Sequence, residues 1–102
     1  MMNTYHLMLE HFHNTPKQVE KAYQLIVDYF NRGESFIKDN MRGNPFKPQW
    51  WIFVNDLSND SKEQLIEKLL EEGWANVEII PTTENLAGKE RTWVIKLYAV
   101  LR

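Results

Sequence analysis

The stretch Trp50-Trp51-Ile52-Phe53-Val54 decides the fold class, because five strong strand-forming residues follow one another without a polar break. Apolar side chains on both faces indicate a strand that lies well inside a sheet. A second, longer strand is expected over residues 92–101. One face would carry Trp93, Ile95, Leu97, Ala99 and Leu101, and the other Val94, Tyr98 and Val100. A strand that is apolar on both sides is an aggregation hazard at a free edge, so we expect this one to have two neighbours.

Two helices are expected from apolar residues at three-and-four spacing. The first begins at the capping sequence Thr15-Pro16-Lys17-Gln18 and ends near Gly33. Its apolar stripe consists of Val19, Ala22, Tyr23, Ile26, Val27 and Phe30. The second helix follows the capping cluster at residues 56–61 and ends at Gly73, and Trp74 is expected to cover its last turn. Its stripe consists of Leu65, Ile66, Leu69 and Leu70.

The remaining elements complete an α+β pattern. Alternation of Tyr5, Leu7 and Leu9 with His6, Met8 and Glu10 predicts a strand over residues 4–12. Residues 77–81 predict another strand, which pairs antiparallel with the last one. Residues 34–49 leave two alternatives, a short strand at 35–38 or a loop that covers the sheet. The order fits a ferredoxin-like α/β sandwich, with a mostly antiparallel four- to five-stranded sheet and two helices on one face. We expect one domain over residues 1–102.

Composition excludes several classes of protein. The chain has no Cys, which excludes disulfides and thiolate metal sites and fits a reducing compartment. It shows no export signal and no apolar run near the length of a membrane span, so we expect a cytoplasmic protein that does not contact membranes. None of the four Gly falls in a phosphate-binding pattern, and we expect neither a cofactor nor a bound metal.

The three His, His6, His11 and His13, are the residues best suited to acid–base chemistry. His13-Asn14-Thr15 fits the His-x-Thr motif of the two-histidine phosphoesterases once, but no His follows position 13 to supply a second motif. Metal binding would need further ligands that are not nearby. We therefore expect no enzymatic activity, and a small-ligand pocket or enzyme site near His11 and His13, beside Tyr23, is the third functional hypothesis.

The sheet carries more apolar residues than one layer of helices can cover, which is typical of a partner surface. We therefore expect a non-enzymatic binding or regulatory protein of the inhibitor or adaptor type. Its partner is another protein or a second copy, in a homodimer through the sheet. The candidate partner-binding residues are Phe46, Trp50, Trp51 and Tyr98.

The alternative is a module that binds single-stranded nucleic acid through residues 38–51. Lys38, Arg42 and Lys47 are interleaved there with aromatic rings, and such segments hold phosphates and stacked bases. The formal net charge of −2 argues against a surface built mainly for a phosphate backbone.

Overall fold

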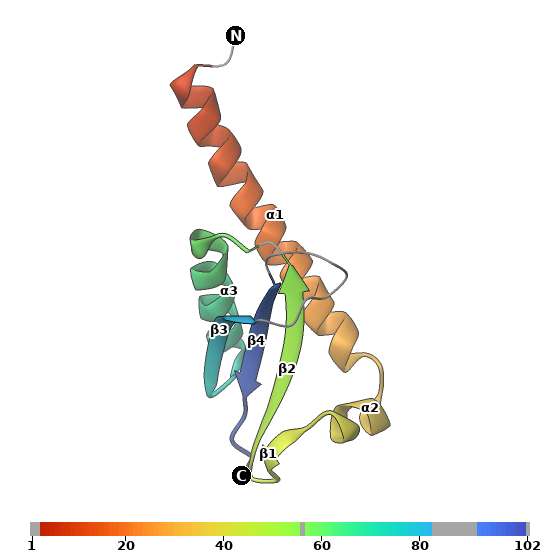
Figure 1. The fold of residues 1–102 in the computed structure, drawn as a ribbon. Coiled ribbons are helices and arrows are strands. Elements are labelled where there is room, and N and C mark those ends of the chain that lie inside the picture. Colours follow the sequence, from red (N-terminus) through yellow and green to blue (C-terminus); the bar gives the residue numbers. More distant parts are fainter. Residues whose placement is uncertain (1–2, 56, 83–91, 102) are drawn as a thin grey trace.

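The described part of the chain folds into one four-stranded antiparallel sheet with three helices (Figure 1). The computed structural model describes residues 3–55, 57–82 and 92–101, and of residues 6, 7 and 9–16 it gives the backbone alone. The elements are α1 (Thr4–Phe30), α2 (Glu34–Asp39), β1 (Arg42–Asn44), β2 (Lys47–Asn55), α3 (Asn59–Glu72), β3 (Asn76–Thr82) and β4 (Thr92–Tyr98). The α+β class and the antiparallel sheet expected from the sequence are confirmed.

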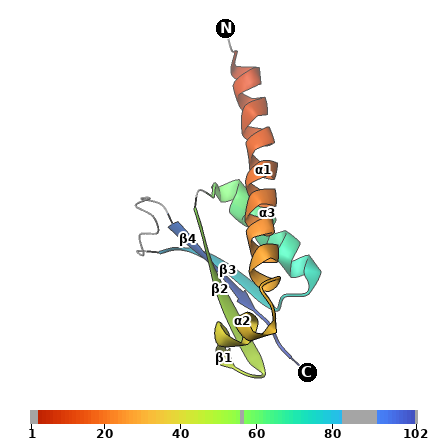
Figure 2. The same cartoon turned by 90° about the vertical axis from the view of Figure 1, so that its right-hand side faces the viewer.

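Helix α1 is the largest departure from the sequence prediction. It has 27 residues and runs through Pro16, so the strand expected over 4–12 and the helix start expected at Thr15 are both wrong. The alternation that predicted a strand also contains Tyr5, Met8 and Phe12 at helical spacing, and a stretch this short fits both periods. Figures 1 and 2 show the N-terminal half of α1 extending past the sheet.

The strand order β1-β2-β4-β3 differs from the expected topology. Strands β2 and β3 both run antiparallel to β4, so they are parallel to each other, and α3 connects them in a split βαβ unit with β4 inserted. The second such unit would need a strand where α1 begins. The ferredoxin-like arrangement is therefore not confirmed, and the described residues form three helices where two were expected.

Strand β4 lies between β2 and β3, which confirms the prediction that it has two neighbours. Leu97 pairs with Trp50 on one side and with Val77 on the other. The strand ends at Tyr98, earlier than expected. The residues after Tyr98 still lie beside the start of β2, because the backbone N–H groups of Ala99 and Leu101 donate to the carbonyls of Pro48 (3.0 Å) and Phe46 (2.9 Å).

The core lies between one face of the sheet and the helices α1 and α3 (Figure 2). Its buried residues are Val19, Ala22, Ile26, Ile52, Val54, Leu57, Leu65, Leu69, Val77, Ile95 and Leu97. Helix α3 begins at the N-cap Ser58, whose hydroxyl accepts from the N–H of Ser61, and ends at Gly73 in the left-handed conformation. The ring of Trp74 then packs on Phe30 and Trp50, with ring centroids 5.6 and 6.0 Å away.

Residues 34–49 form neither the strand nor the covering loop that the sequence left open. They form the short helix α2 and the β1–β2 hairpin. The Trp50 indole Nε1 donates to the carbonyl of Ile37 at 2.9 Å, which holds α2 on the same side of the sheet as α1 and α3. Gly43 is required in β1, because its φ is 81° and a Cβ there would lie 2.8 Å from the Lys47 carbonyl oxygen.

Replacing Gln18 with alanine should lower the free energy of unfolding by about 1–2 kcal/mol. The Gln18 side-chain Oε1 accepts from the Ser61 hydroxyl at 2.7 Å and from the Ser58 N–H at 3.1 Å, which ties α1 to the start of α3. Ser61 is fully buried, so its hydroxyl would lose the acceptor to which it now donates. Urea unfolding measures the change, and the exposed neighbour Lys17→Ala should change it by less than about 0.5 kcal/mol. Equal effects of the two would contradict this role of Gln18.

Candidate binding face of the sheet

The two faces of the sheet differ in what covers them. Trp50, Ile52 and Val54 of β2 point to the helices and are buried, whereas Trp51 and Phe53 point to the opposite side and are half-buried. We call this opposite side the helix-free face, because α1 and α3 lie on the other side (Figure 2) and α2 is hydrogen-bonded to Trp50, which also points to that other side. Its residues on β2 are Gln49, Trp51 and Phe53, on β4 Val94, Lys96 and Tyr98, and on β3 Glu78 and Ile80.

The strand register arranges the helix-free face in rows. Phe53 pairs with Val94, which pairs with Ile80, so one apolar row crosses β2, β4 and β3. Val94 in the middle is 4% exposed, and Ile80 at the end is 37% exposed. The next row consists of Trp51, Lys96 and Glu78. An apolar row therefore lies beside an aromatic and charged one.

Trp51 is held between two cations that come from the strands on either side. The Arg42 guanidinium lies 3.8 Å from the centre of the indole ring, and the Lys96 ammonium lies 4.3 Å from it. Both are cation–π contacts of favourable geometry. The indole Nε1 donates to the Gln49 side-chain oxygen at 2.9 Å, so the ring is fixed in orientation.

Tyr98 has a raised pKa, because it is partly buried and because Glu78 lies beside it as a charge and a hydrogen-bond partner. A tyrosine whose folded pKa is raised contributes stability that is present below the unfolded pKa of about 10 and is lost as pH rises through the folded pKa. Alkaline titration of near-ultraviolet absorbance should therefore show Tyr98 ionising later than a free tyrosine. The difference between the wild type and Tyr98→Phe isolates this group. Ionisation at the ordinary pKa would contradict both the partial burial of Tyr98 and its contact with Glu78.

The structure brings some of the sequence-predicted site residues together and separates others. Trp51, Tyr98 and Arg42 meet on the helix-free face, and Lys47 is exposed at the hairpin end of β2. Trp50 is 8% exposed and belongs to the core side, so the prediction that it contacts a partner does not fit its position. Phe46 lies at the hairpin tip and is 74% exposed.

Lys38 does not join the helix-free face. It lies on α2, and its ammonium forms an exposed ion pair with Glu34 at 2.7 Å. Sequence reasoning did not single out Lys96 or Ile80, although both belong to the face. The signal was present for Lys96, because it alternates with Val94 and Tyr98 along β4.

The backbone of His11 and His13 lies in α1, and their side chains are outside the described residues. His13 is ten residues from Tyr23 along the helix, which is about 15 Å. Tyr23 lies in a hollow of about 470 Å³ between α1 and α3, where its hydroxyl donates to a Glu72 carboxylate oxygen at 2.8 Å. That hydrogen bond is the main cause of the raised pKa of Tyr23.

Two further properties of the described residues bear on function. They contain no cluster of three or more His, Cys, Asp or Glu side chains that could hold a metal ion. Within the same part of the chain, no helix combines the length and the apolar character needed to cross a bilayer. No protein family, curated protein or solved structure matches this chain.

Proposed function

We propose that this chain is a non-enzymatic binding module that docks a protein partner on the helix-free face, as an inhibitor or adaptor would. The observation that carries the proposal is the apolar row Phe53–Val94–Ile80, which crosses three strands and has none of the described helices over it. Trp51 and Tyr98 widen this surface, and aromatic residues are enriched at protein interfaces. The absence of Cys is compatible with a function in the cytoplasm, where thiols stay reduced.

Selection from a random peptide library displayed on phage tests this proposal with the full chain as bait. We expect enriched peptides rich in apolar residues. Ile80→Asp should weaken their binding at least about tenfold, because it places a charge in the apolar row. Leu70→Asp is the matched control, since Leu70 is 42% exposed but belongs to α3 on the other side of the sheet. Failure to enrich any peptide, or equal loss in both variants, would count against the proposal.

Binding of single-stranded nucleic acid is the second candidate, and the cations beside Trp51 favour it. Arg42 and Lys96 would meet phosphates while Phe53 and the guanidinium plane offer stacking surfaces. The protein partner ranks first because both cations already pack on the Trp51 ring, and a stacked base would have to displace one of them. The net charge of −2 adds to this argument.

Fluorescence anisotropy with short labelled single-stranded oligonucleotides separates the two candidates. Nucleic-acid binding would appear at low salt, weaken steeply as salt is raised, and fall in Arg42→Ala and Lys96→Ala. We expect no binding that depends on these two residues. Salt-sensitive binding lost in both variants would move the nucleic-acid function to first place.

A further inference from the structure

One edge of β2 is left without a strand partner in the described part of the chain. Strand β1 pairs only with the hairpin end of β2, through Gln49, Pro48 and Lys47. The Pro48 carbonyl accepts from Ala99, so Pro48 and alternate residues after it direct their backbone groups to β4. Trp51, Phe53 and Asn55 therefore direct their N–H and C=O groups away from β4, toward a position that no described strand occupies.

This free stretch of β2, residues 51–55, lacks the charged and proline residues that protect a sheet edge from pairing with another strand. Strand β3 at the opposite edge carries Glu78 and Pro81, which hinder pairing with another strand. Residues 51–55 of β2 contain neither a charge nor a proline. A hollow of about 450 Å³ lies beside its Trp51 end, and another of about 280 Å³ lies beside its Asn55 end. The free stretch itself carries no charged side chain, and residues of α1 and residues 39–42 line the two hollows beside it.

We propose that a second copy of this chain pairs antiparallel with this edge, so that two sheets join into one of eight strands about a two-fold axis at Phe53. In this register Phe53 faces its own copy, and Trp51 faces Asn55 of the second copy. Each pair would exchange two backbone hydrogen bonds. The row Phe53–Val94–Ile80 then continues into the same row of the second copy. Phe–Phe pairs of this kind stabilise antiparallel strands.

Helix α1 is self-complementary about the same axis. Phe30 packs on Trp50, and Ala22 and Leu25 line a hollow with Val54, so α1 runs antiparallel along β2 and has Leu25 near the level of Phe53. A two-fold axis at Phe53 therefore makes the two α1 helices antiparallel to each other, with their centre near Leu25.

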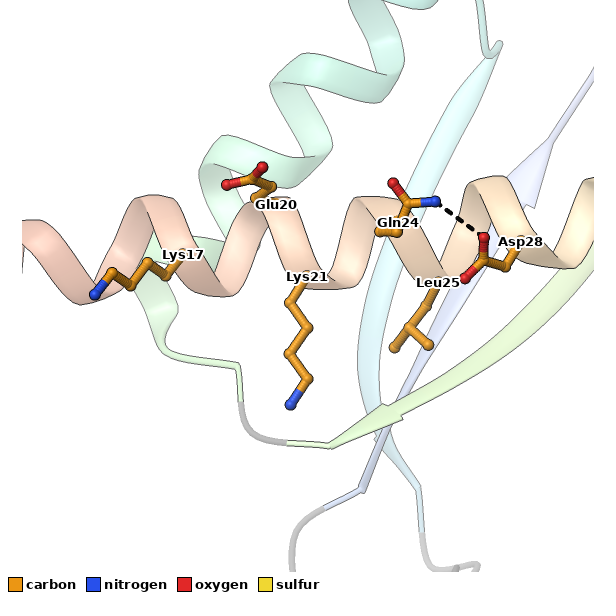
Figure 3. Close-up of a pocket in the computed structure, with 6 residues that line it drawn as sticks. All are labelled: Lys17, Glu20, Lys21, Gln24, Leu25 and Asp28. Carbon is orange, nitrogen blue, oxygen red and sulfur yellow. Dashed lines mark hydrogen bonds between the residues drawn. The ribbon is translucent and has the colours of Figure 1, made fainter.

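The charges on α1 fit this arrangement. Lys21 and Asp28 are two turns apart on α1, with Leu25 between them, and all three are exposed (Figure 3). Antiparallel helices centred near Leu25 place Lys21 of each copy opposite Asp28 of the other. Figure 3 shows Lys21 and Leu25 pointing away from the helix axis toward the end of β2. One Asp28 oxygen accepts from Gln24 at 2.9 Å, which orients the carboxylate.

Sedimentation velocity of the full chain, from micromolar to submillimolar concentration, tests the pairing. We expect a reversible dimer whose dissociation constant rises at least about tenfold in Phe53→Lys, because two ammonium groups would then face each other on the axis. Ile80→Lys is the matched control. It places the same charge in the same row but far from the axis, and should leave the dimer unchanged.

Charge reversal on α1 gives a second arm that does not perturb β2. Lys21→Asp should weaken the dimer, and Lys21→Asp combined with Asp28→Lys should restore it, because the pairing across the axis is regained. A monomeric wild type, equal weakening by Phe53→Lys and Ile80→Lys, or failure of the double reversal to restore the dimer would each overturn the edge pairing. A monomeric wild type would still leave the helix-free face available to a protein partner, so the two proposals fail separately.

Discussion

Replacing Leu97 with alanine is expected to lower the free energy of unfolding by about 3–4 kcal/mol. Leu97 is fully buried in β4, where its strand neighbours are Trp50 and Val77 and the helices pack above it. A central strand cannot move to fill the cavity that the substitution leaves. Domains of this size are stable by about 5–15 kcal/mol, so the loss is a large share of the total. Urea unfolding followed by tryptophan fluorescence measures it.

Leu101→Ala is the matched control for this variant, because it removes the same atoms four residues further along the chain. Leu101 is 55% exposed, and its hydrogen bond to Phe46 uses the backbone alone. The change should stay below about 0.5 kcal/mol. A comparable loss in the two variants would show that β4 is not the central strand.

Replacing Trp50 with alanine is expected to cost about 3–5 kcal/mol. The Trp50 ring packs edge-on against Phe30 and Trp74, and its Nε1 holds the carbonyl of Ile37 in α2. Trp50→Phe keeps most of the packing and removes the hydrogen bond, so it should cost about 1–2 kcal/mol. Urea unfolding gives both values, and amide exchange should rise in α2 in both variants.

The neighbouring residue Trp51 supplies the control for Trp50. Its ring lies on the helix-free face and contacts Arg42 and Lys96, so Trp51→Ala should cost about 1–2 kcal/mol. A larger loss for Trp51→Ala than for Trp50→Ala would mean that the two faces of β2 are assigned the wrong way round.

The parts of the fold that the sequence predicted correctly depend on local signals that are nearly unambiguous. The run 50–54 contains strand formers on both faces, and α3 is bounded by Ser58 and Gly73, which have capping roles. The start of α1 was mispredicted because Pro16 suits a first helical turn, although the helix continues through it. The conformation of residues 34–49 depends on a tertiary contact, the hydrogen bond from the Trp50 indole to the Ile37 carbonyl. No local sequence pattern indicates this contact.

The sequence predicts only part of the candidate site, because the rest also depends on tertiary contacts. Strand alternation places Trp50 and Trp51 on opposite faces, but it does not say which face the helices cover. The contact between Arg42 and Trp51 depends on the hairpin register, and the contribution of Lys96 and Ile80 depends on the order β2-β4-β3. The Arg42–Trp51 contact and the positions of Lys96 and Ile80 both depend on which strands pair and in which register. Local sequence patterns do not indicate this long-range pairing.

Site-specific photo-crosslinking in cells that make this protein tests the central claim most directly, namely that the helix-free face is the docking surface. A photoreactive amino acid replaces either Ile80 on that face or Leu70 on α3, two apolar residues that are 37% and 42% exposed. We predict that illumination yields a crosslinked adduct of defined mass from position 80 and none from position 70. Adducts from position 70 alone, or equally from both positions, would contradict the claim.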